Sequence, residues 1–90
     1  MFKDNADDQK FEWREEGETA FADYYDRGGV IVLPHVEAPH ALRGTGAASR
    51  LMQAVADHAR QEKLSLMPTC SYAVAWFRRH PDQADVLAKG

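Results

Sequence analysis

The segment of this 90-residue chain best suited to chemistry is a glycine-containing stretch at residues 43–49. Gly44 and Gly46 let the backbone approach a ligand closely, and Arg43 adds a fixed positive charge that suits phosphate. The stretch opens a segment predicted to be a helix, whose first amides and dipole favour an anion. The pattern therefore indicates a phosphate or pyrophosphate site. A tight strand-to-helix connection with a solvated Arg43 is the plainer alternative.

Two familiar nucleotide motifs do not fit this stretch. The dinucleotide fingerprint needs a third glycine, which residues 44–49 lack, and the chain is too short for a dinucleotide-binding fold. The P-loop pattern needs a Gly-Lys-Ser/Thr ending, which is also absent.

Four side chains elsewhere could take part in catalysis. His35, in a predicted strand, could act as a general base or be hydrogen-bonded within the sheet. Glu37 is an alternative base or a solvated carboxylate. Cys70 precedes a predicted helix whose amides favour a thiolate, but on the residues alone the favoured interpretation is a small buried hydrophobe. Tyr72 offers a hydroxyl that can donate a hydrogen bond.

Composition excludes several classes of function. The formal charge of −3 argues against nucleic-acid binding, and no apolar run is long enough for a membrane span. The one cysteine cannot form an internal disulfide, and the first residues lack signal-peptide features, so a cytoplasmic protein is expected. His40, His58 and His80 have no metal-ligand spacing, so we predict no metal.

The elements that must position these residues follow from hydrophobic periodicity. Residues 11–14 and 20–25 alternate as two strands of a hairpin, and residues 30–36 form a third strand in which Pro34 predicts an edge or a bulge. Residues 1–9 are polar and are predicted to be a flexible tail ahead of a single domain at residues 10–90.

The second half of the chain is predicted to be helical with one strand. A period near four marks a helix at residues 46–62, followed by a short strand at 64–67 and a helix at 71–79. Residues 82–90 are expected to add a short helical turn. The strand, helix and strand form a crossover, so the prediction is an α/β fold with a mixed sheet of about four strands and two main helices.

Residues 43–48 resemble the signature of the GNAT superfamily of N-acetyltransferases, which is Gln or Arg, two residues, Gly, one residue, then Gly or Ala. The surrounding motifs are similar to those of a small single-domain subgroup. They are Gly17-Glu18-Thr19-Ala20, Tyr24, His35, Pro39-His40-Ala41-Leu42-Arg43-Gly44-Thr45-Gly46, Pro68-Thr69-Cys70-Ser71-Tyr72 and Arg79-His80-Pro81. This resemblance covers residues 11–88.

The resemblance implies a minimal GNAT-like fold that binds acetyl-coenzyme A as cosubstrate and transfers its acetyl group to a primary amine. The implied cofactor-binding residues are Val36, Ala38, Arg43, Gly44, Thr45, Gly46, Ala47, Ala48 and Ser49. Strand amides near residues 36–38 would polarise the thioester carbonyl, and His35 or Glu37 would deprotonate the amine. Tyr72 would donate to the departing thiolate. Cys70 would lie near the thiol end, so direct attack and an acetyl-Cys70 route both stay open.

The sequence departs from the subgroup in ways that affect the site. Val36 and Ala38 replace a Thr and a Val, so no threonine hydroxyl is offered there. No segment matches the helices that cover the acceptor in larger GNAT enzymes, so an open acceptor side is expected. The acceptor would be a small molecule or a protein, and the chain is expected to be a monomer. A non-catalytic coenzyme A or acyl-CoA-binding module is the main alternative, and an interaction domain that lost the site is a third.

Overall fold

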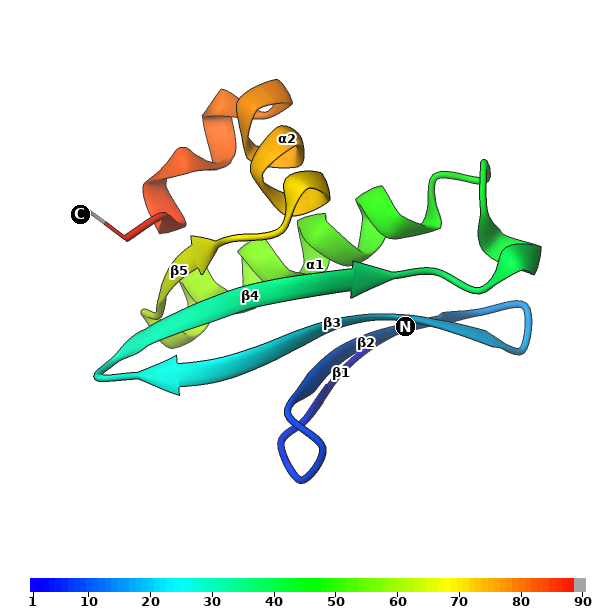
Figure 1. Ribbon diagram of the computed structural model, residues 1–90, viewed down its shortest axis with the longest axis horizontal. Helices are drawn as coiled ribbons and strands as arrows, with labels where there is room; N and C mark the ends of the chain where they lie inside the picture. Colours follow the sequence, from blue (N-terminus) through cyan, green and yellow to red (C-terminus); the bar gives the residue numbers. More distant parts are fainter. Residues whose placement is uncertain (89–90) are drawn as a thin grey trace.

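The computed structural model describes residues 1–88 and places a mixed sheet against a long helix, with the helical segments that follow residue 70 beside β5 (Figure 1). The strands are β1 (Phe2–Asn5), β2 (Lys10–Glu15), β3 (Glu18–Arg27), β4 (Val30–Glu37) and β5 (Ser65–Pro68). The helical elements are η1 (His40–Leu42), α1 (Ala47–Glu62), α2 (Ser71–Arg79) and η2 (Pro81–Val86).

The strand order in the sheet is the order along the chain. β1 to β4 pair antiparallel with their neighbours, and β5 runs parallel to β4 after the crossover through α1. The predicted α/β class with a mixed sheet is therefore confirmed. The sheet has five strands rather than about four.

The additional strand is β1, which corrects the expectation that residues 1–9 form a flexible tail. Phe2 lies opposite Trp13 of β2, and its ring stacks 5.8 Å from the ring of Phe11. The same ring lies 5.2 Å from the imidazole of His58 in α1. These aromatic contacts and the backbone pairing with β2 together dock the strand.

Pro34 lies at a bulge in β4, as its missing N–H predicted. Asp23 of β3 pairs with His35, whereas Tyr25 pairs with Val32. Two residues of β4 therefore lie opposite one residue of β3, because proline cannot donate to the ladder.

Beyond this bulge β4 continues beside β3 but no longer pairs with β5. The parallel pairing ends with Leu33 opposite Pro68. The carbonyl of Leu33 then accepts the backbone N–H groups of Thr69 at 3.1 Å and Cys70 at 3.4 Å, which turns the chain into α2. The last residues of β4, up to Glu37, are left without a β5 partner, so the sheet parts beside the start of α1.

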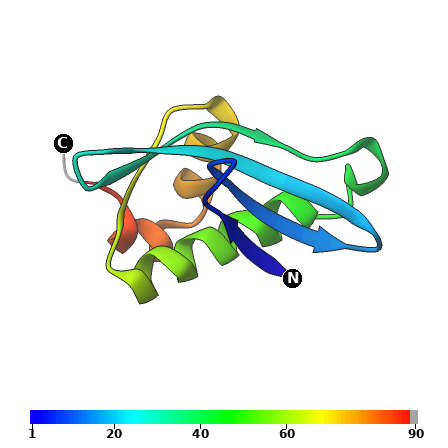
Figure 2. The ribbon, with the colours of Figure 1, turned by 90° about the horizontal axis from the view of Figure 1, so that it is seen from below.

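The core lies between the sheet and α1, which runs along one face of the sheet (Figure 2). The helix predicted at residues 46–62 is confirmed as Ala47–Glu62. Its buried residues are Ala47, Leu51, Met52, Val55, Ala56 and Ala59, which pack with Phe11, Ala20, Ala22, Leu33 and Leu66 from the strands. Trp76 and Phe77 of α2 are buried in the same core.

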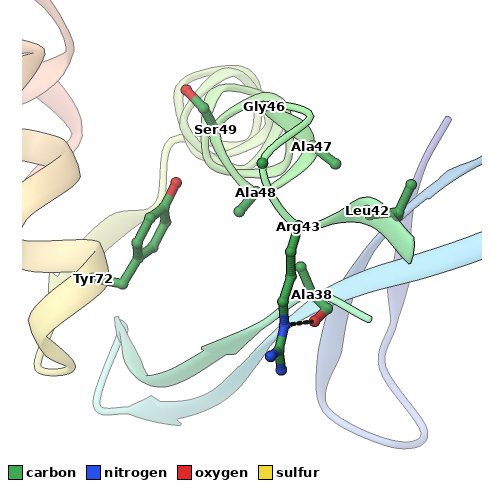
Figure 3. Close-up of a pocket in the computed structure, with 9 residues that line it drawn as sticks. Ala38, Leu42, Arg43, Gly46, Ala47, Ala48, Ser49 and Tyr72 are labelled. Atoms are coloured by element: carbon green, nitrogen blue, oxygen red, sulfur yellow. Dashed lines mark hydrogen bonds between the residues drawn. The ribbon is translucent and has the colours of Figure 1, made fainter. Parts of the chain in front are cut away.

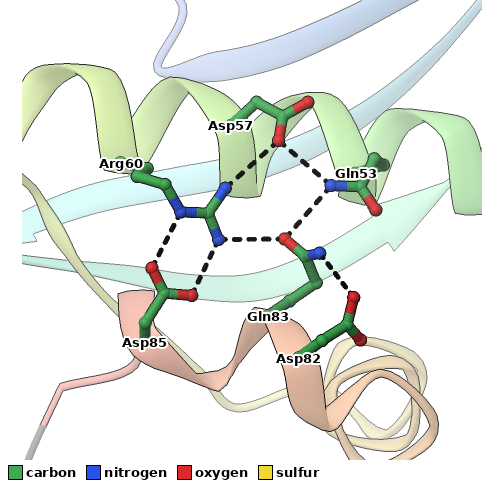
Figure 4. Close-up of polar contacts among 6 residues, drawn as sticks. All are labelled: Gln53, Asp57, Arg60, Asp82, Gln83 and Asp85. Carbon is green, nitrogen blue, oxygen red and sulfur yellow. Dashed lines mark hydrogen bonds and ion pairs between the residues drawn. The ribbon is translucent and has the colours of Figure 1, made fainter.

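A polar network holds η2 against α1 (Figure 4). Arg60 donates to both carboxylate oxygens of Asp85, each at 2.7 Å, and also to Asp57 and Gln83. Gln53 bridges the same Asp57 and Gln83, each at 3.1 Å. These contacts fix the chain after α2, where the predicted helical turn is present as η2.

The segment after η2 returns to the sheet. Leu87 forms an isolated parallel bridge with Leu66 of β5, and the Ala88 N–H donates to the Leu66 carbonyl at 2.7 Å. The predicted helical turn and the predicted domain both extend to residue 90, and residues 89–90 lie outside the described residues.

Candidate functional site

The turn between β4 and α1 is organised by its own backbone and by Thr45. Gly44 has φ +78° and Gly46, the N-cap of α1, has φ +86°, conformations that other residues adopt only with strain. The Arg43 N–H donates to the His40 carbonyl at 3.1 Å, and the Thr45 hydroxyl donates to the Leu42 carbonyl at 2.6 Å. The two glycines are therefore required by the shape of the turn.

This turn leaves several backbone amides available to a ligand. The first helical hydrogen bond of α1 runs from the Arg50 N–H to the Gly46 carbonyl, and the Ala47 N–H donates to the Thr45 hydroxyl at 3.3 Å. Among residues 1–88 no acceptor is found for the N–H groups of Gly44, Gly46, Ala48 and Ser49. Such a set of free donors at a helix N-terminus is an anion-binding arrangement.

Arg43 supplies the positive charge at this turn. Its side chain is exposed, and its Nε donates to the Ala38 carbonyl at 3.3 Å (Figure 3). Within residues 1–88, neither terminal nitrogen of the guanidinium has a hydrogen-bond or ion-pair partner. Both can therefore meet an anion.

The amides and Arg43 border a hollow of about 260 Å³ between α1, the end of β4 and α2 (Figure 3). Seven of the predicted cofactor-binding residues line it, namely Ala38, Arg43, Gly44, Gly46, Ala47, Ala48 and Ser49. Leu42 and Tyr72 complete the wall. Leu42 was missed, although an apolar residue directly before Arg43 in the motif was a signal for it.

Two predicted cofactor-binding residues do not line the hollow. Val36 lies opposite Ala22 of β3 and packs against the core, so only its backbone is left to meet a ligand. Thr45 is exposed and shapes the turn through its hydroxyl. Neither contributes a side-chain contact from the wall.

The two candidate bases lie outside the hollow. His35 and Glu37 alternate with core-facing Val36 on β4, so their side chains project from the sheet face away from the core. Both are about half exposed, and the Nε2 of His35 is 3.8 Å from the Oε1 of Glu37. The structure places His35 and Glu37 next to each other, but neither side chain lines the hollow.

Tyr72 is the one predicted catalytic side chain in the wall. It is half buried at the start of α2, and burial raises the pKa of its hydroxyl, with a smaller opposing effect from Arg79. The hydroxyl is therefore protonated at neutral pH and can donate a hydrogen bond into the hollow. The nearby Trp76 indole donates to the Ser49 hydroxyl at 2.9 Å and so holds α2 against α1.

Cys70 caps α2. Its Sγ accepts the Ala73 N–H at 3.4 Å, and its own N–H donates to Leu33. The side chain is half buried, packs against the core and is not in the wall of the hollow. These contacts give it a structural role, while its participation in catalysis stays a prediction.

A second hollow, of about 330 Å³, lies at the other end of α1. Three carboxylates line it, from Asp4, Asp26 and Glu62, together with His58 and Tyr24. The Tyr24 hydroxyl donates to Asp4 at 2.6 Å, and burial followed by this carboxylate raises the pKa of Tyr24 to about 12. This hollow therefore repels anions.

Within residues 1–88, no three His, Cys, Asp or Glu side chains are arranged to hold a metal ion. None of the helices in the same part of the chain is long and apolar enough to cross a membrane.

The sequence model of the GCN5-related N-acetyltransferases matches residues 10–86, which is most of the chain. This chain belongs to that family. The matched region contains the turn, both helices and every residue in the wall of the first hollow. The family match is thus consistent with the signature recognised at residues 43–48.

A solved structure supports the fold of this family member. It is the solution NMR structure of a GCN5-like protein from Staphylococcus aureus that was proposed to be an N-acetyltransferase. The two proteins are 23% identical and superpose with a TM-score of 0.68, over 100% of this chain and 89% of the other. At this identity the likeness establishes the shared fold alone.

Proposed function

We propose that the first hollow binds acetyl-coenzyme A and that the protein transfers the acetyl group to a primary amine. The observation that carries the proposal is the set of free amides at Gly44, Gly46, Ala48 and Ser49 beside the unpaired end of Arg43. These groups suit an anion, and family membership makes coenzyme A the appropriate one.

The residues present fit the pyrophosphate of coenzyme A. The free amides would donate to its oxygens, and the Arg43 guanidinium would add a charge-assisted contact. Among residues 1–88 no carboxylate lines the hollow, so none of their charges there opposes a polyanion. Bound acetyl-coenzyme A supplies a thioester whose acyl carbon is open to attack by an amine.

The protein groups near the parting of the sheet would do the remaining work. The backbone of residues 36–38, which has no β5 partner, would polarise the acyl carbonyl. The protonated Tyr72 hydroxyl would donate to the developing thiolate. His35 or Glu37 would take the amine proton on the exposed sheet face, where either a small molecule or a protein acceptor has access.

A binding module without turnover is the second candidate, and one observation favours it. His35 and Glu37 do not line the hollow, so binding of coenzyme A does not by itself place a base at the acyl carbon. Binding and turnover must therefore be tested separately.

Calorimetric titration with coenzyme A tests binding. Arg43→Ala should weaken the affinity by about tenfold or more, as expected for loss of one charge-assisted contact. Arg27→Ala, an exposed arginine in the β3–β4 hairpin, is the matched control and should bind like wild type. Absence of binding to wild type at millimolar coenzyme A would reject the proposal.

Thiol release from acetyl-coenzyme A across a panel of primary amines tests turnover. His35→Ala should lower the rate by about 10² if the imidazole is the general base, with unchanged coenzyme A affinity. Glu37→Gln tests the alternative base in the same way. Tight binding without release of free thiol for any amine would establish the binding module instead. Wild type that gains one acetyl group at Cys70 without acceptor would favour the acyl-enzyme route.

A further inference from the structure

Arg50, in the first turn of α1, is joined to two separate parts of the chain, the end of β2 and the turn that precedes α1. Its Nε and Nη2 donate to the two carboxylate oxygens of Glu15 at the end of β2. Nη2 also donates to the Thr45 carbonyl at 3.1 Å. A Cβ built on Gly46 would lie 3.0 Å from Nη1, so the guanidinium lies directly against the turn.

Glu15 is itself held in place. Its Oε2 accepts the Trp13 indole N–H at 3.1 Å, and Trp13 packs against the core. Hydrogen bonds from Arg50 and then from Trp13 lower the pKa of the Glu15 carboxyl, so it stays ionised at neutral pH. The chain of contacts from Trp13 through Glu15 and Arg50 to Thr45 therefore connects the β2–β3 hairpin to the turn.

We infer that Arg50 is a positioning residue, and that the Glu15–Arg50 pair holds the turn at residues 44–49 in the shape that binds the pyrophosphate. This inference rests on the proposed function. The pair bridges two elements that share no backbone hydrogen bond, and Thr45 O is the carbonyl between the two glycines of the turn. Losing the pair frees the turn to move, and affinity falls because the amides must be ordered on binding.

The rival explanation is that Arg50 acts only by its positive charge near the anion. The two explanations predict opposite changes in coenzyme A affinity for Glu15→Gln. If charge alone matters, removing the Glu15 carboxylate leaves Arg50 less neutralised and tightens coenzyme A binding. If the pair positions the turn, the same change weakens binding by about five- to tenfold, a usual coupling within one polar network.

Arg50→Lys separates the explanations a second time. Lysine keeps the charge but is a point donor that cannot bond both Glu15 oxygens and Thr45 together. Positioning predicts that Arg50→Lys, Arg50→Gln and Glu15→Gln all weaken binding to a similar extent, and that Glu15→Gln adds little to Arg50→Gln. Wild-type affinity in Arg50→Lys, or tighter binding in Glu15→Gln, would overturn the inference.

Arg60→Gln is the matched control. It removes a two-point pair of arginine with a carboxylate, Asp85, from the last turn of the same helix, far from the turn at residues 44–49. Exposed pairs contribute little to stability, so all these variants should unfold near the wild-type temperature. Only the Glu15 and Arg50 variants should lose affinity.

Backbone amide NMR relaxation of the ligand-free protein distinguishes failure of this inference from failure of the proposed function. The amides of residues 44–50 should gain nanosecond motion in the Glu15 and Arg50 variants but not in Arg60→Gln. That result would support the positioning role even if wild type bound no coenzyme A. Unchanged relaxation in all variants would reject it.

Discussion

The two hollows at opposite ends of α1 differ more in the sign of their polar groups than in size. The one at the N-terminal end measures about 260 Å³ and offers free amides and Arg43, whereas the other measures about 330 Å³ and offers carboxylates from Asp4, Asp26 and Glu62. The larger hollow is the worse candidate for a polyanion. Volume alone does not identify a binding site, and the charge that the walls present decides which ligand can enter.

The largest expected effect comes from reversing that charge. Ala48→Glu puts a carboxylate among the free amides, where it would occupy them and repel phosphate, so coenzyme A affinity should fall by about 10². Gln61→Glu, exposed near the other end of α1, adds the same charge and is the control. Calorimetric titration of both variants is the measurement. Equal affinities would show that the ligand does not use the N-terminal hollow.

The acidic hollow should reveal itself by the titration of Tyr24. Burial, and then Asp4, raise the pKa of Tyr24 to about 12 from an ordinary value of 10.0. The absorbance of the phenolate follows this titration. Asp4→Asn should shift the titration toward the ordinary value but not fully, because burial remains. Since the folded pKa is the higher one, this group's contribution to stability is lost as pH rises above about 10. Titration of Tyr24 at its ordinary pKa would contradict the proposed difference in charge between the two hollows at the ends of α1.

Glu15 and Asp85, the carboxylate partners of the two arginines of α1, should each contribute to the loss of stability at low pH. The pKa of Glu15 is lowered by Arg50 and that of Asp85 by Arg60, from ordinary values of 4.5 and 3.8. The unfolded chain then binds more protons in this range, so stability is lost as pH falls below about 4.5. Urea unfolding at several pH values should show a shallower loss for Glu15→Gln and for Asp85→Asn. A slope identical to wild type would mean that the pairs make no measurable contribution to stability.

Salt should have the smallest effect. Raising the ionic strength from about 0.1 M to about 1 M shortens the screening length from about 10 Å to about 3 Å, which weakens the contribution of exposed Arg43. Hydrogen bonds from the backbone amides act at contact and are screened little. Coenzyme A affinity should therefore fall by only about threefold, and Arg43→Ala should lose most of this dependence. A fall far beyond this would mean that charge, rather than the shape of the turn, supplies most of the affinity.

Local signals in the sequence were sufficient for most of the fold. The helix at residues 47–62 follows from its apolar period, the bulge follows from Pro34, and the parallel β5 follows from the crossover. The strand β1 did not follow, because its only apolar anchor is Phe2. The Phe2 ring holds β1 in place through contacts with Phe11 and His58, which are remote from it in the sequence.

The candidate site was predictable where one short segment builds it. Residues 43–49 lie together because they are consecutive, and most of them line the hollow. The location of His35 relative to that hollow depends on which sheet face it occupies, and therefore on strand register. The pairing of Arg50 with Glu15 joins residues 35 positions apart, which no local pattern announces.

The bridge between Leu87 and Leu66 occupies part of one edge of the sheet. A sheet edge with unpaired N–H and C=O groups is a template on which another chain can add a strand and begin to aggregate. The Ala88 N–H donates to the Leu66 carbonyl, so the chain covers part of the β5 edge with its own backbone. The opposite edge, β1, is short and carries the exposed charges of Lys3 and Asp4. Removing the residues after Val86 would uncover β5 and should make the protein prone to self-association without touching the hollow.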